Sequence, residues 1–184
     1  GGAGYIGSHT AVVMAEAGLT PIILDDLSNS SESVIHRLEE ITGYKPIFYK
    51  GDCNDSSILN QIGKEHQLAG VIHFAAYKAV GESTQEPLKY YQNNLGSLMV
   101  LLDFMKREGI QDLVFSSSCT VYGQPDVLPV TETTPRKDAE SPYGNTKKVC
   151  EDILVDYVKS KAGVRVISLR YFNPVGAHPS AIIG

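Results

Sequence analysis

The chain has 184 residues, of which 42% are hydrophobic and 20% are charged, an ordinary composition for a globular protein. It has 16 Lys and Arg residues against 21 Asp and Glu, a net charge of -5 without any basic run, which argues against nucleic acid as a partner. No apolar run reaches the length of a membrane span, so we expect no membrane contact. The cysteines Cys53, Cys119 and Cys150 match no metal-ligand or redox spacing and indicate free thiols in the cytosol.

The pattern of apolar residues predicts alternating helices and strands. After a glycine turn at 1–7, the expected helices cover 10–17, 31–41, 56–66, 87–108 and 142–161. The expected strands cover 21–24, 46–49, 71–74, 113–115 and 164–171. These strands are continuously apolar, which is typical of a parallel sheet buried on both faces and joined by right-handed crossovers. The sequence therefore predicts an α/β fold with a doubly wound parallel sheet.

The glycine turn is spaced as in proteins that bind a dinucleotide. Gly1, Gly4 and Gly7 would let the backbone approach a pyrophosphate at the start of a helix. Asp25 ends the next strand, 18 residues after Gly7, close to the spacing of a carboxylate that binds the adenosine ribose. A carboxylate there repels a 2′-phosphate and favours NAD over NADP, although Asp25 could also simply cap a turn. For Asp52, contact with the adenine and a turn role are equally supported.

Unusual residues collect where the predicted strands end. They occupy positions 1–7, 25, 52, 75–76, 116–118 and 171–173. In an open α/β sheet the ligand binds outside the carboxyl ends of the strands. These segments are therefore expected to face one cleft.

Tyr143 and Lys147 are four residues apart at the start of a predicted helix, which places them on one face. A neighbouring cation favours the phenolate, so Lys147 is expected to lower the pKa of Tyr143 and let it accept a proton from an alcohol. Ser118 follows a predicted strand and would bind the reacting oxygen, whereas Ser116 and Ser117 are expected only to cap a helix. The set Ser118, Tyr143 and Lys147 predicts the oxidation of an alcohol.

These motifs resemble the extended short-chain dehydrogenase/reductase superfamily. Within it, the stretches 4–9, 73–83, 116–123, 141–144 and 169–180 are similar to the UDP-hexose 4-epimerases, and the similarity runs the whole length of the chain. The resemblance implies a tightly held NAD that is reduced and reoxidised in each turnover. It implies interconversion of UDP-galactose and UDP-glucose through a 4-keto sugar, and a homodimer packed through the helices that begin at Pro87 and Pro142.

The resemblance also assigns residues to the two ligands. Those implied for the cofactor are Gly1, Gly4, Tyr5, Ile6, Gly7, Asp25, Asn29, Ser30, Asp52, Cys53, Phe74, Ala75, Lys78, Asn93, Tyr143, Lys147 and Tyr171. Those implied for the substrate are Lys78, Ser118, Tyr143, Phe172 and Asn173. Without the resemblance, Lys78 and Asn93 would be interpreted as solvated or helix-surface residues.

Both ends of the chain suggest a part of a longer protein. The glycine turn is expected to follow a strand, so we expect a first strand before Gly1. On this interpretation residues 1–184 are an NAD-binding domain, and 173–184 begin the connection to a substrate domain. We expect this piece alone to be inactive.

Two other functions fit part of the pattern. A nucleotide-sugar 4,6-dehydratase shares the oxidation step but needs an acid and base pair after the strand-end hydroxyl, where this chain has Cys119 and Thr120. A non-catalytic NAD-binding protein of the same fold could keep the glycine turn but would be free to lose the catalytic trio. The trio is present, which favours the enzyme.

The remaining candidates receive ordinary structural roles. His73 falls within a strand, and we expect it to be a core residue. Asn145 and Thr146, between Tyr143 and Lys147, are expected to face outward. The five histidines form no cluster with cysteines or carboxylates, so no metal site is predicted.

Overall fold

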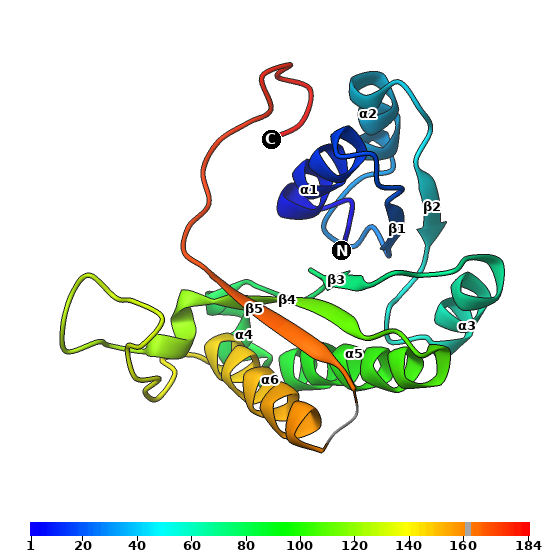
Figure 1. The fold of residues 1–184 in the computed structure, drawn as a ribbon. Coiled ribbons are helices and arrows are strands. Elements are labelled where there is room, and N and C mark those ends of the chain that lie inside the picture. Colours follow the sequence, from blue (N-terminus) through cyan, green and yellow to red (C-terminus); the bar gives the residue numbers. More distant parts are fainter. Residues whose placement is uncertain (161–162) are drawn as a thin grey trace.

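The structure is a computed structural model that describes residues 1–160 and 163–184. The described chain alternates helices and parallel strands (Figure 1). The helices are α1 (Tyr5–Glu16), α2 (Ser33–Thr42), α3 (Ser56–Glu65), α4 (Val80–Gln85), α5 (Pro87–Glu108), the 3-10 helix η1 (Cys119–Tyr122) and α6 (Pro142–Lys159). The strands are β1 (Ile22–Asp25), β2 (Ile47–Lys50), β3 (Val71–His73), β4 (Asp112–Ser118) and β5 (Arg165–Tyr171).

The strands form two parallel sheets, where the sequence predicted one. In the described residues β1 pairs with β2, while β4 lies between β3 and β5. The backbone of Gly1, and not a paired strand, lies between the two sheets. Its nitrogen donates to Leu24 O at 2.6 Å, and a Cβ atom added to it would lie 2.5 Å from Ala75 N. The carboxyl ends of β1 and β3 therefore meet at the glycine turn.

Each sheet has its own hydrophobic core. α5 and α6 cover one face of the β3–β4–β5 sheet (Figure 1), and the predicted apolar side of α5 is buried in this core, with Leu98, Leu101, Leu102 and Met105 at most 4% exposed. The second core joins α1, β1 and α2. Ile183, near the end of the chain, inserts into this second core, so the segment after β5 returns across α1.

The expectation that the sheet is buried on both faces is wrong at β5. Successive side chains of a strand point to opposite faces. Val166 packs on the core beneath α6, whereas Ile167 and Leu169 are 61% and 39% exposed. Only the face toward α6 is covered by a described helix, because α5 and α6 both pack on that side.

Most predicted elements are confirmed, with two differences. The α5 boundaries match the prediction at both ends, whereas α4 and η1 were not predicted. The strand predicted to end at 115 continues to Ser118, since its ladder with β5 runs as far as Ser118 opposite Tyr171. α6 ends at Lys159 in the described residues, and Lys161, the predicted end, lies outside them.

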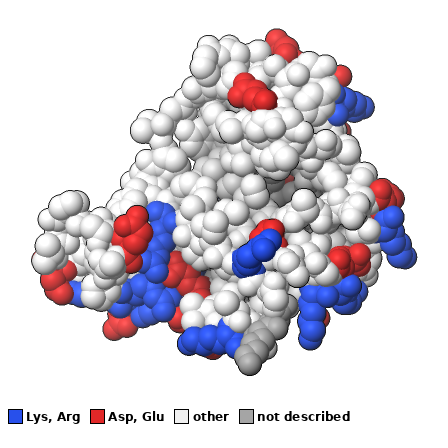
Figure 2. Space-filling model, in the orientation of Figure 1, with Lys and Arg blue, Asp and Glu red and all other residues white. Residues whose placement is uncertain are grey.

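The molecular surface carries mixed charge. Lys and Arg side chains alternate with Asp and Glu on the face in Figure 2, and the middle of that face is largely uncharged. Exposed ion pairs such as Arg165 with Asp112, at 2.6 Å, add little to stability because solvent screens them. None of the helices described here combines the length and apolarity needed to cross a bilayer.

Candidate active site

The glycine turn leads into α1. Among the described residues, no side chain caps the first turn of this helix. Gly4 is the N-cap of α1, and no acidic residue lies in the first turn. Gly7 is required by packing, because a Cβ there would lie 2.4 Å from Gly1 O. Gly4 is different: its φ is -73°, and an added Cβ would meet only Gly1 O at 3.5 Å. Neither conformation nor described neighbours require glycine at this position, whereas a ligand lying against the backbone would.

Asp25 fixes the glycine turn to the end of β1. Its carboxylate accepts hydrogen bonds from Ala3 N at 2.9 Å, Leu27 N at 2.9 Å and Ser30 Oγ at 2.8 Å. The turn-capping role considered for Asp25 is thus present. Its contact with a ribose stays a prediction, and one lone-pair site of the carboxylate remains available for it.

The end of β2 is connected to α5 through two asparagines. Asp52 Oδ1 accepts from the backbone and side chain of Asn54 at 2.8 and 3.0 Å, and Asn54 Nδ2 also donates to Asn93 Oδ1 at 3.2 Å. The structure therefore brings Asp52 and Asn93 to one place. Burial raises the pKa of the neighbouring Cys53 thiol to about 11, which keeps it neutral and unreactive.

The segment after β3 adjoins the glycine turn. Phe74 and Ala75 are half-buried there, and the backbone of Ala75 approaches Gly1 so closely that no side chain fits between them. Lys78 lies exposed three residues later, and Asn29 and Ser30 lie in the turn after β1. Their contacts with a cofactor or substrate stay predictions.

Asn94 connects this segment to the helix that carries Tyr143. It is buried in α5, accepts from Tyr77 N at 2.9 Å, and donates to Tyr77 O and to Thr146 Oγ1, both at 3.0 Å. All of its side-chain hydrogen-bonding groups are therefore engaged in fixing three elements. Sequence analysis missed Asn94, because one asparagine within an amphipathic helix carries no local signal.

The helix α6 begins as its sequence predicts. Ser141 is the N-cap, and its Oγ accepts from Gly144 N at 3.1 Å. Pro142 follows at the first helical position, where its missing N–H costs nothing. The capped start places Tyr143 and Lys147 one turn apart on the same face.

Lys147 is buried and directed at the backbone of β4. Its Nζ donates to Ser116 O at 2.8 Å and lies 5.0 Å from the centre of the Phe115 ring. Burial lowers the pKa of this ammonium to about 8. The group is thus mostly charged at neutral pH, although at a cost in desolvation.

The expectation that Lys147 lowers the pKa of Tyr143 is wrong in this structure. Burial raises the pKa of Tyr143, a hydrogen bond with Ser118 lowers it, and the nearby Cys119 raises it, so the pKa lies above the ordinary value. The ammonium has little effect because it is directed at Ser116 O. The hydrogen bond with Ser118 is therefore the protein's own means of favouring the phenolate.

The serines of β4 have different roles. Ser118 Oγ accepts from Thr120 N at 3.3 Å, capping η1, and keeps its own proton to donate. The expectation that Ser116 and Ser117 are helix caps is wrong, because both lie within β4. Ser116 offers its carbonyl to Lys147, while Ser117 Oγ donates to a carboxylate of α6 at 2.6 Å.

The residues between Tyr143 and Lys147 do not face outward as expected. Thr146 is fully buried, with 0% exposure. Asn145 Nδ2 donates to Tyr91 OH at 2.6 Å. The reason is that α5 packs along α6, so this side of α6 is an interface between helices.

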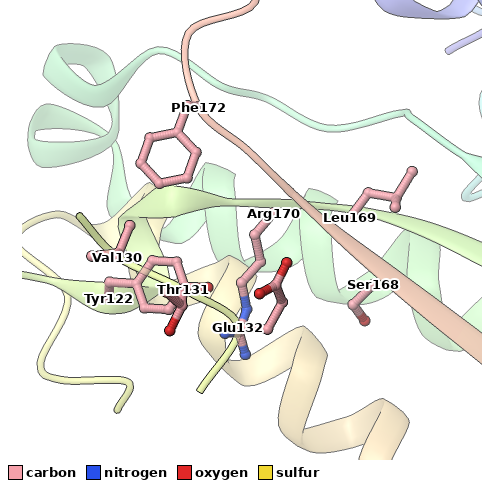
Figure 3. A pocket seen from close by; sticks show the side chains of 8 residues that line it. All are labelled: Tyr122, Val130, Thr131, Glu132, Ser168, Leu169, Arg170 and Phe172. Carbon is pink, nitrogen blue, oxygen red and sulfur yellow. The ribbon is translucent and has the colours of Figure 1, made fainter. Parts of the chain in front are cut away.

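The last predicted site residues lie at the end of β5. Tyr171 is half-buried, and Asn173 is exposed. Phe172 is 58% exposed and lies over an open cavity of about 550 Å³ (Figure 3). The other residues that line this cavity are Tyr122, Val130, Thr131, Glu132, Ser168, Leu169 and Arg170.

His73 is the core residue that was predicted. It is 5% exposed, and its ring stacks on Phe115 with centroids 6.1 Å apart. Burial lowers its pKa to about 3, so it is neutral. In the described parts of the chain, no three His, Cys, Asp or Glu side chains are grouped to hold a metal ion.

Comparison with known proteins identifies the family. UDP-glucose 4-epimerases from Erwinia amylovora and Dictyostelium discoideum are 49% and 51% identical over the whole chain, which covers 55% and 53% of their lengths. The solved UDP-glucose 4-epimerase of Bifidobacterium longum, in complex with NAD+ and UDP, matches the whole chain with a TM-score of 0.97 and 44% identity, over 55% of its own length. The chain thus spans about half the length of these relatives, and the predicted α/β fold is confirmed. The family profile matches residues 1–183, so the chain belongs to the NAD dependent epimerase/dehydratase family.

Proposed function

We propose that this chain is the NAD-binding part of an enzyme that interconverts UDP-galactose and UDP-glucose by epimerisation at C4. The observation that carries the proposal is the convergence of Ser118, Tyr143 and Lys147 at the carboxyl end of β4. Identity of 49% and 51% over this chain, to relatives named UDP-glucose 4-epimerase, supports the same activity. Residues 173–184 would lead from this domain to the part that completes the substrate site.

The glycine turn and α1 have the features that a pyrophosphate requires. The first turn of α1, at Tyr5 and Ile6, offers backbone N–H groups and the positive end of the helix dipole. Gly4 leaves the space that a phosphate would fill. The carboxylate of Asp25 would disfavour a 2′-phosphate, which supports NAD over NADP. Asp52, Cys53 and Asn93 would then lie toward the adenine and phosphates, with Tyr171 toward the nicotinamide.

The catalytic trio divides the chemistry at C4. Tyr143 takes the proton of the C4 hydroxyl. Ser118 favours the phenolate before the sugar binds and then donates its one hydrogen bond to the sugar oxygen. The buried ammonium of Lys147, which donates to Ser116 O, would also hold the nicotinamide ribose beside Tyr143. NAD, when bound, accepts the C4 hydride and later returns it. Between the two hydride transfers the 4-keto sugar rotates, so that the hydride returns to the opposite face of C4. Tyr143 then gives its proton back to the C4 oxygen.

The substrate is held from the end of β5 and the segment after β3. Phe172, which lies over the open cavity (Figure 3), and Asn173 would contact the nucleotide sugar. Lys78, exposed after β3, would contact it from that segment. The positions after Ser118 hold a thiol and a hydroxyl, Cys119 and Thr120, in a 3-10 helix. Neither supplies the carboxylic acid that elimination of water would need, so dehydration is disfavoured.

The outer sides of α5 and α6 fit a homodimer. Leu88 and Met99 on α5 are 72% and 53% exposed, and Val155 and Val158 on α6 are 46% and 43% exposed. Apolar side chains on two adjacent helices favour burial against a second copy. The three unpaired cysteines fit a reducing cytosol.

The proposal is tested by incubating the full-length protein with UDP-galactose without added cofactor and measuring UDP-glucose by chromatography. We expect conversion to an equilibrium mixture, because the cofactor is regenerated in each turnover. A purified protein that contains NAD but forms no UDP-glucose would refute the proposal.

A further inference from the structure

A buried carboxylate on α6 has no part in the proposed reaction. Glu151 is 5% exposed and lies one turn beyond Lys147 and two turns beyond Tyr143, so the three side chains share one face of the helix. A buried carboxylate is costly to desolvate unless it is well paired. Its presence beside the catalytic pair therefore needs a reason.

The carboxylate of Glu151 is saturated by groups from three other segments. Ser117 Oγ donates to Oε1 at 2.6 Å, and the guanidinium of Arg170 binds both oxygens at 2.9 and 2.8 Å. Arg136, from the loop before α6, reaches Oε2 at 3.3 Å. Glu151 thus connects β4, β5 and that loop to one point on α6.

The contact with Ser117 is the central one of three between β4 and α6. The carbonyl of Ser116 binds Lys147, and the hydroxyl of Ser117 binds Glu151. Ser118, the next residue, adjoins the hydroxyl of Tyr143 in the first turn of α6. Three consecutive residues of one strand thus face three turns of one helix, and the bond from Ser117 to Glu151 is one of the contacts that hold this register.

Arg170 extends this connection toward the substrate side. It reaches from β5 beside Tyr122, over whose ring its guanidinium lies at 4.8 Å (Figure 3). The next residues along β5 are Tyr171 and Phe172. A change at Glu151 therefore reaches both the serine end of β4 and the wall of the open cavity.

We propose that Glu151 is a positioning residue, which holds Ser118 against Tyr143 by binding Ser117, Arg170 and Arg136 at once. This inference rests on the proposed function, since it assumes that Ser118 and Tyr143 act on the sugar. Glu151 itself touches neither ligand. It acts through the relative position of β4 and α6, which must be held within a fraction of an ångström for proton transfer.

The test compares Glu151→Gln with a matched control in the full-length protein. Asp152 is the next residue, pairs with the same Arg136 at 2.6 Å, and has a half-exposed side chain. Asp152→Asn therefore removes the same charge from the same helix without touching the serines. Ser117→Ala is the third variant, because it removes only the hydroxyl contact and leaves the ion pairs in place.

We expect Glu151→Gln to lower kcat by up to about 100-fold with little change in KM, while NAD content and the folded fraction stay near wild type. The acid limb of the kcat/KM profile, which reports the free enzyme, should move to higher pH, because Ser118 then lowers the pKa of Tyr143 less. Ser117→Ala should also lower kcat and move the acid limb to higher pH, but by less. Asp152→Asn should change neither.

Three results would overturn the inference. The first is a wild-type kcat and pH profile in Glu151→Gln. The second is an activity loss that only follows the loss of folded protein, with the profile unmoved. If Glu151→Gln does not fold, a wild-type profile in Ser117→Ala overturns it. Failure of the wild-type protein to convert UDP-galactose would instead refute the proposed function.

Discussion

The two helices that begin at the site, α1 and α6, differ in how their N-termini are capped. α6 is closed by its own sequence, since Ser141 caps it and Pro142 follows. α1 starts at Gly4, and among the described residues no side chain caps its first turn. The first turn of each helix has backbone N–H groups that need hydrogen-bond acceptors. Of these two helices, only α6 receives such an acceptor from a side chain that the structure describes.

The difference separates the tasks of the two helices. A helix such as α6, which is capped and packed against β4, can hold Tyr143 and Lys147 in place for chemistry. An uncapped helix preceded by glycines presents its N–H groups and dipole to an anion. Substitutions at the two helix starts should therefore separate catalysis, cofactor binding and stability.

The largest expected effect is the loss of kcat from a substitution in α6. Tyr143→Phe removes the group that transfers the proton, so kcat should fall by about 100- to 10,000-fold. NAD should stay bound, since the ring remains. Conversion of UDP-galactose and the cofactor content of the purified variant are the two measurements, and near-normal turnover would contradict the assignment.

The next effect tests the uncapped helix. Gly4→Ala places a methyl group where we propose that the phosphates lie, and should weaken NAD binding on the order of 10-fold, or about 1.4 kcal/mol. Stability should change by less than about 1 kcal/mol, because described neighbours leave room for the methyl group. Calorimetric titration with NAD and chemical denaturation measure the two quantities.

Gly81→Ala is the matched control for that variant. Gly81 lies in α4, and an added Cβ meets nothing within 4 Å. NAD affinity should stay at the wild-type value. Equal affinities for the Gly4 and Gly81 variants would argue against phosphate binding at the glycine turn.

A smaller effect is expected at the cap of α6. Ser141→Ala leaves Gly144 N without its partner and should lower the free energy of unfolding by about 1 kcal/mol. NAD affinity should not change, because this helix start is closed by the protein itself. Urea denaturation reports the first quantity, and an unchanged midpoint would mean that water replaces the cap.

The smallest effect is the pH dependence of stability. Burial raises the pKa of Glu151, but the hydrogen bonds from Arg170 and Ser117 together lower it by more. The pKa in the folded state therefore lies below that in the unfolded state. The stabilisation is present above the unfolded pKa and is lost as the pH falls through the folded pKa. Denaturation curves at acid pH should show this loss in wild type and in Asp152→Asn, and less of it in Glu151→Gln.

Local signals predicted the elements that carry them. α5 begins at Pro87 and ends before Gly109, whose φ is 69°, and both boundaries follow from the geometry of those two residues. Tyr143 and Lys147 were found because helical spacing alone places them together. The glycine turn was found for the same reason, since its spacing is local.

The remaining features depend on contacts between distant segments. The serines ending β4 are weak strand formers, and only pairing with β5 makes them part of the strand. Asn94 binds Tyr77 and Thr146, which lie 17 and 52 positions away. Glu151 binds Arg136 and Ser117, which lie 15 and 34 positions away. The pKa of Tyr143 was predicted in the wrong direction, because spacing does not reveal that Lys147 is directed at Ser116 O.

The most direct test of the account follows a deuterium atom at C4 of UDP-galactose, added to the full-length protein without cofactor. Internal oxidation and reduction at the site of Tyr143 return the same hydrogen to the sugar. We therefore predict that UDP-glucose forms with the deuterium still at C4, detected by mass spectrometry. Product that has exchanged this deuterium for solvent hydrogen would contradict the account.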